Sequence, residues 1–228
     1  MAISYPLSFP DYTGITHITL RQVSAAKLTE SPFTFKQQSI VHTGQRWEAD
    51  VSLPPMKAED AKKWIAWLSS LRGTRGTFLM GDPTGATAAG SLPTLLPTLI
   101  LDFVNGAYNT ITDGVYAYVN GSNQTGGSLN ISTSAISTTG FLLAGDYIQL
   151  GSGSTTSLHL VLQDVDTDSA GDATLELWPD VRTAPVDEAT VTVTNPQGLW
   201  RLSTNQFMWD INSASTFGIM FTAVEAVQ

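Results

Sequence analysis

The sequence contains no cysteine, so the fold uses no disulfide bond, thiol nucleophile or thiolate metal site. Charged residues are also scarce, at 14% of the chain against a typical share of about 25%. Such a surface relies on uncharged polar residues for solubility, and serine and threonine are dense in residues 84–160. A surface of this kind also suits a protein that packs against other proteins.

Basic residues are few, and the formal net charge of the chain is −9. Binding of nucleic-acid phosphates needs clustered lysine and arginine. The tightest basic group follows one predicted helix and its exit: Lys57, Lys62, Lys63, Arg72 and Arg75. We interpret this group as the solvated face of that helix, and we expect no nucleic-acid partner.

Long hydrophobic runs are absent as well. The most apolar stretch, Leu92–Val104, is interrupted by Pro93, Pro97 and Asp102, and it is too polar to span a bilayer. The first residues, Met1–Pro10, lack the basic start and apolar run of a signal peptide. We therefore expect synthesis in the cytoplasm and no membrane insertion.

Alternating apolar and polar residues predict strands in the first part of the chain. Thr16–Val23 alternates, and Phe33–His42 and Arg46–Leu53 are predicted to form a hairpin around Thr43-Gly44. In the second of these strands, one face is apolar and the other is charged or polar, which is typical of a half-buried antiparallel strand.

One helix is predicted between Pro54-Pro55 and Gly73. Its apolar residues follow helical spacing: Ala61, Trp64, Ile65, Leu68 and Leu71. Trp67 lies at the edge of this stripe. Packing of the two tryptophans against the sheet is the favoured interpretation, and contact of Trp67 with a neighbouring subunit is the alternative.

The middle of the chain holds about six short strands separated by turn residues, which predict a small β-barrel or sandwich. These strands are Val115–Val119, Ser128–Ile131, Tyr147–Leu150, Leu158–Asp164, Ala173–Trp178 and Val186–Thr194. A final hairpin, Phe207–Ile211 with Phe217–Phe221, is expected to pair with the N-terminal sheet because a two-stranded ribbon is marginal alone.

The prediction is therefore a mainly β protein with two domains. Residues 1–92 and 196–228 form a β-sandwich with one helix, completed by the C-terminal hairpin. Residues 93–195 form an inserted, peripheral β-barrel, either OB-like or a sandwich. Insertions of this kind are tolerated at surface loops whose ends lie close together.

No catalytic motif stands out, and no histidine has a partner at metal-ligand or triad spacing. Asp164, Asp166 and Asp168 suggest a calcium loop, but Ser169 and Leu175 occupy the positions that need glycine and glutamate. We expect no metal, no cofactor and no enzymatic activity. Exposed tyrosines could instead stack on a sugar, as a carbohydrate-binding module does; the candidates are Tyr108, Tyr116 and Tyr118.

Several short segments of the sequence resemble the tail-tip proteins of long-tailed bacteriophages, and most of all those of the distal tail protein type. They are Tyr5–Pro10, Ser31–Thr34, Trp47–Met56, Phe78–Pro83, Ala144–Leu150 and Asn195–Leu202. They cover most of the chain and concern the fold, since none of them is a catalytic signature.

The resemblance implies a structural virion protein of the tail tip, with an N-terminal β-sandwich domain assembled as a hexameric ring. Such a ring joins the tail tube to the hub that carries the receptor-binding parts, and a second β domain projects outward. Many members of that family carry that domain after the first, whereas here we expect an insertion. The expected interface residues are Trp47, Trp64, Trp67, Phe207 and Trp209.

Three alternatives stay open at this point. The chain could be a tube, terminator or minor tail protein, or a carbohydrate-binding module that contacts host surface glycan. A tail-associated hydrolase would need two acids across a cleft, and the sequence does not place them.

Overall fold

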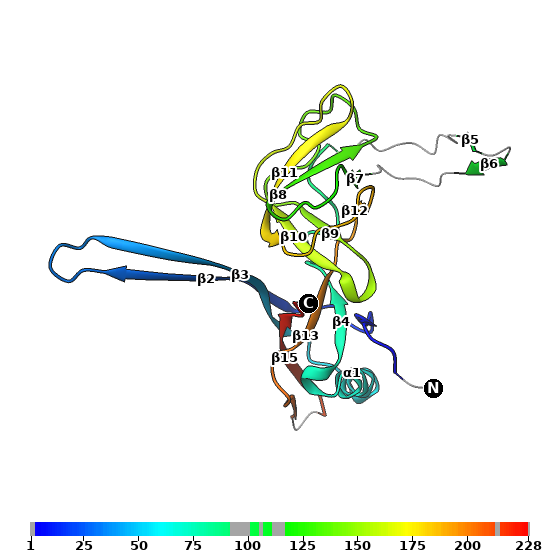
Figure 1. The fold of residues 1–228 in the computed structure, drawn as a ribbon. Coiled ribbons are helices and arrows are strands. Elements are labelled where there is room, and N and C mark those ends of the chain that lie inside the picture. The colour runs from blue at the N-terminus through cyan, green and yellow to red at the C-terminus, as the bar shows by residue number, and fades with distance from the viewer. Residues whose placement is uncertain (1–2, 92–100, 105–106, 111–116, 213–214, 228) are drawn as a thin grey trace. The chain divides into compact units, whose positions relative to one another are not determined.

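A computed structural model describes residues 3–91, 101–104, 107–110, 117–212 and 215–227. The described chain is mainly β, with one α-helix, a seven-stranded sheet and a closed six-stranded barrel (Figure 1). The predicted fold class is thus confirmed. We call Met1–Asp82, Ser152–Leu158 and Gln197–Gln228 the sheet unit, and Pro83–Gly151 with His159–Pro196 the barrel unit.

The sheet unit joins both ends of the chain in one sheet, in the order β1-β4-β13-β15-β3-β2, with β14 also paired to β15. Its strands are β1 Leu7–Ser8, β2 His17–Glu30, β3 Gln37–Ser52, β4 Thr77–Met80, β13 Gly198–Leu202, β14 Met208–Ile211 and β15 Phe217–Glu225. β15 pairs antiparallel with both β3 and β13, so the C-terminal hairpin completes the N-terminal sheet as predicted.

Helix α1, Ala58–Ser70, lies where the sequence predicts it. Glu59 and Asp60 occupy its first turn, where carboxylates favour the positive end of the helix dipole. Arg72 and Gly73 take left-handed backbone conformations, with φ of 53° and 69°, which end the helix before the short 3-10 turn Gly73–Arg75. Of the described helices, none has the length and apolar character needed to cross a membrane.

The core of the sheet unit is aromatic. Trp64 and Trp67 of α1 meet edge to face, with ring centroids 5.7 Å apart, and Trp67 packs in the same way on Phe78 of β4 at 5.2 Å. Phe221 of β15 adds a fourth ring, 6.3 Å from Phe78. These edge contacts add about 0.5–1.5 kcal/mol per pair to the burial of the rings.

The hairpin predicted around Thr43-Gly44 is wrong. β3 continues straight through these residues, and it pairs with β2 from Ser52 to Gln37. Between the pairs Ser24–Gln45 and Ala26–Val41, β3 carries extra residues, so Thr43-Gly44 forms a bulge and not a turn. A Cβ at Gly44 would lie 3.1 Å from the Cβ of Ala25, which explains the glycine.

The barrel unit closes in the order β10-β11-β8-β7-β12-β9, which matches the predicted number of strands. The strands are β7 Ala117–Val119, β8 Gly126–Thr133, β9 Tyr147–Leu150, β10 Ser157–Val161, β11 Asp172–Val181 and β12 Thr190–Thr192. Inward residues such as Leu129, Ile131 and Leu175 are fully buried and alternate with outward polar residues. A separate antiparallel pair, β5 Leu101–Val104 and β6 Ala107–Thr110, precedes β7, and a 3-10 turn spans Gly153–Thr155.

Candidate functional site

The sheet unit extends a long two-stranded ribbon beyond its other strands. β15 pairs with β3 only from Glu48 to Ser52, whereas β2 pairs with β3 along its whole length. We call residues 23–46 the arm; Figure 1 shows it in blue, running away from the rest of the sheet unit. At about 3.3 Å per residue, the arm reaches roughly 30 Å past Glu48. Neither of its edges pairs with another described strand.

Ion pairs lie at the base of the arm. Arg21 on β2 binds Asp50 on β3, and the Nη2 atom of Arg46 lies 2.7 Å from a carboxylate oxygen of Glu48. The hydrogen bond and the charge of Asp50 raise the pKa of Arg21 above its ordinary value. These side chains are at least partly solvated, so the pairs contribute little to stability.

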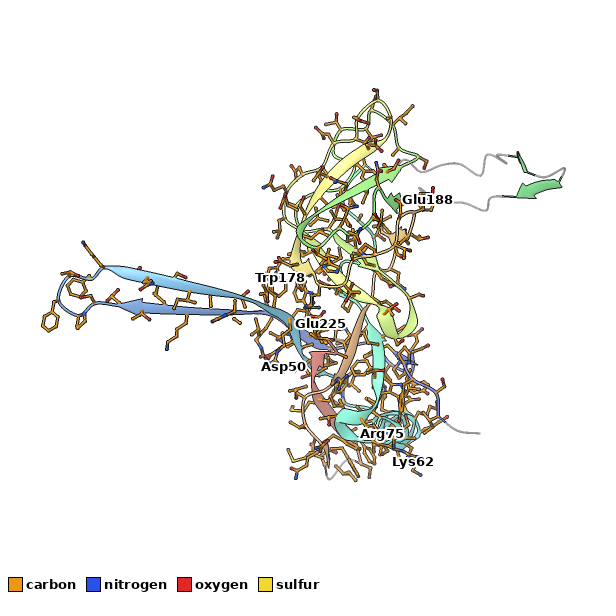
Figure 2. All side chains as sticks on the ribbon, in the orientation of Figure 1. Asp50, Lys62, Arg75, Trp178, Glu188 and Glu225 are labelled. Carbon is orange, nitrogen blue, oxygen red and sulfur yellow. The ribbon has the colours of Figure 1, made fainter. Side chains whose placement is uncertain are left out.

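The arm exposes large apolar side chains. The exposed fraction is 92% for Phe33, 73% for Phe35, 60% for Leu28 and 45% for Ile40. In Figure 2 the side chains of the arm stand out on both faces, with no other element of the sheet unit over them. An isolated two-stranded hairpin is marginally stable in water, and exposed apolar groups of this size mark interaction surfaces. The arm is therefore a candidate interaction surface.

The tip of the arm, residues 31–36, is a hydrogen-bonded turn. The N–H of Ser31 donates to the carbonyl of Lys36 at 3.0 Å, and the N–H of Phe35 donates to the carbonyl of Ser31 at 2.9 Å. Phe35 has a φ of 52°, a conformation that asparagine or glycine adopts far more readily. A bulky aromatic residue held at this unfavourable backbone position points to a use for its side chain.

A second exposed apolar surface lies on the hairpin of β14 and β15, and we call it the β14 patch. Met208 and Met220 face each other across the two strands and are 80% and 68% exposed. Trp209 and Ile211 on the opposite face of β14 are 44% and 58% exposed. All four residues of β14 are exposed, which is unusual for a strand with three apolar members.

All five predicted interface residues belong to the sheet unit, and three of them are buried in it: Trp47, Trp64 and Trp67. Each indole N–H donates to an acceptor of that unit, at 3.0 Å for the first two and 3.1 Å for Trp67. Phe207 is half-buried and Trp209 is exposed, with their ring centroids 5.4 Å apart. The two tryptophans of α1 thus pack within the sheet unit, as the favoured interpretation predicted.

The interpretation of the sequence missed the exposed residues of the arm and of the methionine pair. One signal was present: Ser31-Pro32 is a turn dipeptide, and two phenylalanines follow it closely in an otherwise polar turn. The methionines gave no signal, because alternation along a strand does not reveal which side another element covers.

Of the three predicted sugar-contact tyrosines, the structure describes the side chain of Tyr118. Tyr118 on β7 is 38% exposed, Tyr108 lies on β6, and Tyr116 lies outside the described residues. Near Tyr118, the outer face of the barrel has a hollow of about 340 Å³. Its lining is mostly polar: Asn120, Asn130, Ile131, Asp168, Asp172, Ala173 and Thr174.

Hydrogen bonds within this hollow hold its polar groups in place. The amide of Asn120 donates to the carboxylate of Asp172 at 3.1 Å, and the hydroxyl of Thr174 donates to the amide oxygen of Asn130 at 2.8 Å. Tyr118 lies opposite Ser132 on β8, which in turn lies opposite Asp172 on β11. The tyrosine and the hollow therefore share one outer face of the barrel.

The three aspartates of the suspected calcium loop stabilise turns. Asp164 and Asp166 accept hydrogen bonds from the backbone N–H groups of Ala144 and Gly140, at 2.9 and 2.7 Å. Asp168 accepts from the backbone of Asp172 and Ala170, and these bonds hold its pKa below the ordinary value of 3.8. Within the described part of the chain, no group of three or more histidine, cysteine, aspartate or glutamate side chains could hold a metal ion.

Comparison with known proteins adds no family: no protein-family model matches the chain, and no curated protein matches it.

Proposed function

We propose that this chain is a structural assembly protein of a bacteriophage tail tip, and that its sheet unit forms a ring between the tail tube and the hub. The arm is the observation that carries this proposal, because Phe33 and Phe35 at its end need a protein partner. The resemblance of the sequence to distal tail proteins supports the same role and implies a hexamer. The site of action would be the virion, after synthesis in the host cytoplasm.

The arm also fits the geometry of a ring. A contact between an extended element on one copy and a different surface on the next is heterologous, and it closes into a ring when the rotation between copies permits. Much of the stability of such an assembly comes from its interfaces, which typically bury over 1,200 Å² each. Charged residues make up only 14% of the chain, and their scarcity lowers the desolvation cost of those interfaces.

Mass measurement tests the proposal directly. We expect size-exclusion chromatography with light scattering to give a discrete particle of about six 24.4 kDa chains at high protein concentration. The double variant Phe33→Ser/Phe35→Ser should keep the circular dichroism spectrum of the wild type and lose this particle. A wild-type protein that stays monomeric at every concentration would contradict the ring.

A second candidate function, binding of carbohydrate by the barrel unit, is favoured by the polar hollow beside Tyr118. Amide, carboxylate and hydroxyl groups recognise sugar hydroxyls, and an exposed tyrosine offers a stacking surface. A glycan array with the wild type, Tyr118→Ala and Asn130→Ala tests this function. Glu176→Gln is the matched control, since Glu176 is exposed on β11 and does not line the hollow.

A further inference from the structure

We propose that the tip of the arm docks on the β14 patch of a second copy of this chain. This inference rests on the proposed assembly function and names the two surfaces that would meet. Phe33 and Phe35 are the docking side chains, and Met208 and Met220 form the centre of the surface that receives them.

The two surfaces cannot meet within one chain. Met220 lies opposite Ser52 at one end of β3, whereas the tip adjoins Gln37 at the other end. The β2 residues opposite these ends are His17 and Glu30, so the ends are about 43 Å apart at about 3.3 Å per residue. The arm is held extended by the pairing of β2 with β3, so it cannot fold back to reach the patch. Contact between the two surfaces therefore requires a second copy.

The chemistry of the two surfaces is complementary. Methionine side chains are flexible and polarizable, so an exposed pair can adapt its shape to an inserted ring. Sulfur contacts with aromatic rings are favourable beyond the burial of apolar area alone. The two phenylalanines supply the rings, and a ring with its two χ angles loses little conformational entropy on docking.

Charge favours the same pairing. The arm carries Lys27, Lys36 and Arg46 against Glu30, a net charge of +2, while the whole chain carries −9. The remainder of each copy is therefore at −11, and Asp210 lies exposed in the middle of β14. The positive arm of one copy is attracted at long range to the acidic remainder of another copy. Contact between two arms, or between two acidic remainders, is disfavoured by repulsion.

The contact would link copies head to tail, because its two halves lie at opposite ends of one strand. A head-to-tail contact can be capped, and this property gives a sharp test. One variant, Phe33→Ser/Phe35→Ser, lacks a working tip, and another, Met208→Ser/Met220→Ser, lacks a working patch. All four side chains are at least 68% exposed, so both variants should fold, and circular dichroism checks that they do.

We expect each variant alone to be monomeric under conditions in which the wild type assembles. An equal mixture of the two should form a complex of two chains and nothing larger. The unaltered tip of the patch variant can dock on the unaltered patch of the tip variant, and no further pair of unaltered surfaces remains in that complex. A mixture that stays monomeric, or a patch variant that assembles as the wild type does, would overturn the docking while leaving the ring intact. A wild type that never assembles would overturn the ring itself.

The absence of cysteine allows an independent measurement. Thr34→Cys at the tip and Met208→Cys in the patch, mixed and treated with a short bismaleimide, should give a crosslinked peptide that joins residues 34 and 208. Glu176→Cys in place of Met208→Cys is the control and should give at least tenfold less. Attachment of the tip to phosphatidylcholine and phosphatidylglycerol vesicles, with no 34–208 crosslink, would also overturn the proposal and assign the tip to a membrane.

Discussion

The carboxylate of Glu225 accepts a hydrogen bond of 3.0 Å from the backbone N–H of Trp47, which lies 178 residues earlier in the chain. Glu225 is 7% exposed and lies at the end of β15, opposite Trp200 on β13. Trp47 is the residue at which the arm leaves the sheet. This bond therefore satisfies a backbone donor at the base of the arm, where β3 loses its pairing with β15.

Removal of this acceptor should destabilise the sheet unit. We expect Glu225→Ala to lower the free energy of unfolding by about 1–3 kcal/mol, because the buried N–H of Trp47 loses its partner. Glu225→Gln keeps an acceptor oxygen in the same place and should lose less. Urea unfolding followed by tryptophan fluorescence suits this unit, which holds all the tryptophans except Trp178. Equal losses in the two variants would contradict the role of the bond.

A glycine in the barrel unit gives a second prediction. Gly171 has a φ of 88°, and a Cβ there would overlap the carbonyl oxygen of Thr133. Gly145 has a φ of 102°, and a Cβ there would have no neighbouring atom within 4 Å, so it is a matched control for backbone strain alone. We expect Gly171→Ala to lower the free energy of unfolding by more than about 1 kcal/mol and Gly145→Ala to lower it less. Urea unfolding followed by circular dichroism in each variant measures the difference.

Much of this fold could be predicted from the sequence where local signals agree with one another. The helix of Trp64 and Trp67 has helical spacing, early acids and a terminal glycine, so its limits were predicted closely. The barrel strands are separated by glycine and aspartate turns such as Asp168–Asp172, and a short strand between two turns has few alternatives. The pairing of the C-terminal hairpin with the N-terminal sheet followed from the instability of a lone hairpin.

The arm could not be predicted, because a bulge and a turn look alike in sequence. Thr43-Gly44 has the composition of a turn, yet the glycine is needed there for close approach to Ala25. The true turn, at Ser31–Lys36, includes two phenylalanines, which usually mark a strand. Exposure of Met208 and Met220 depends on which elements cover β14, and that information is tertiary.

Asp168 gives a prediction about pH. Hydrogen bonds from the backbone of Asp172 and Ala170 lower its pKa below 3.8, so the folded state favours the ionised carboxylate. This contribution is present at pH values above 3.8, and it is lost as the pH falls through the lower folded pKa. Asp168→Asn should therefore lower the urea midpoint at pH 7, and the difference from the wild type should shrink below pH 3.8. A difference that stays constant down to about pH 2 would contradict the effect; Glu176→Gln serves as the control.

A substitution at Phe35 should change assembly while leaving the stability of the monomer nearly unchanged. Its φ of 52° is unfavourable for a bulky residue, whereas glycine adopts this conformation freely. In Phe35→Gly the relief of that strain offsets the greater flexibility of the unfolded chain, so we expect the urea midpoint of the monomer to change little. The aromatic ring is lost, so the concentration at which the particle forms should rise at least tenfold, as measured by light scattering. Leu28→Ser, further down the arm, should have a smaller effect, since it lies outside the proposed contact. If Phe35→Gly assembled as well as the wild type, the ring of Phe35 would have no part in the interface, and its strained backbone would need another explanation.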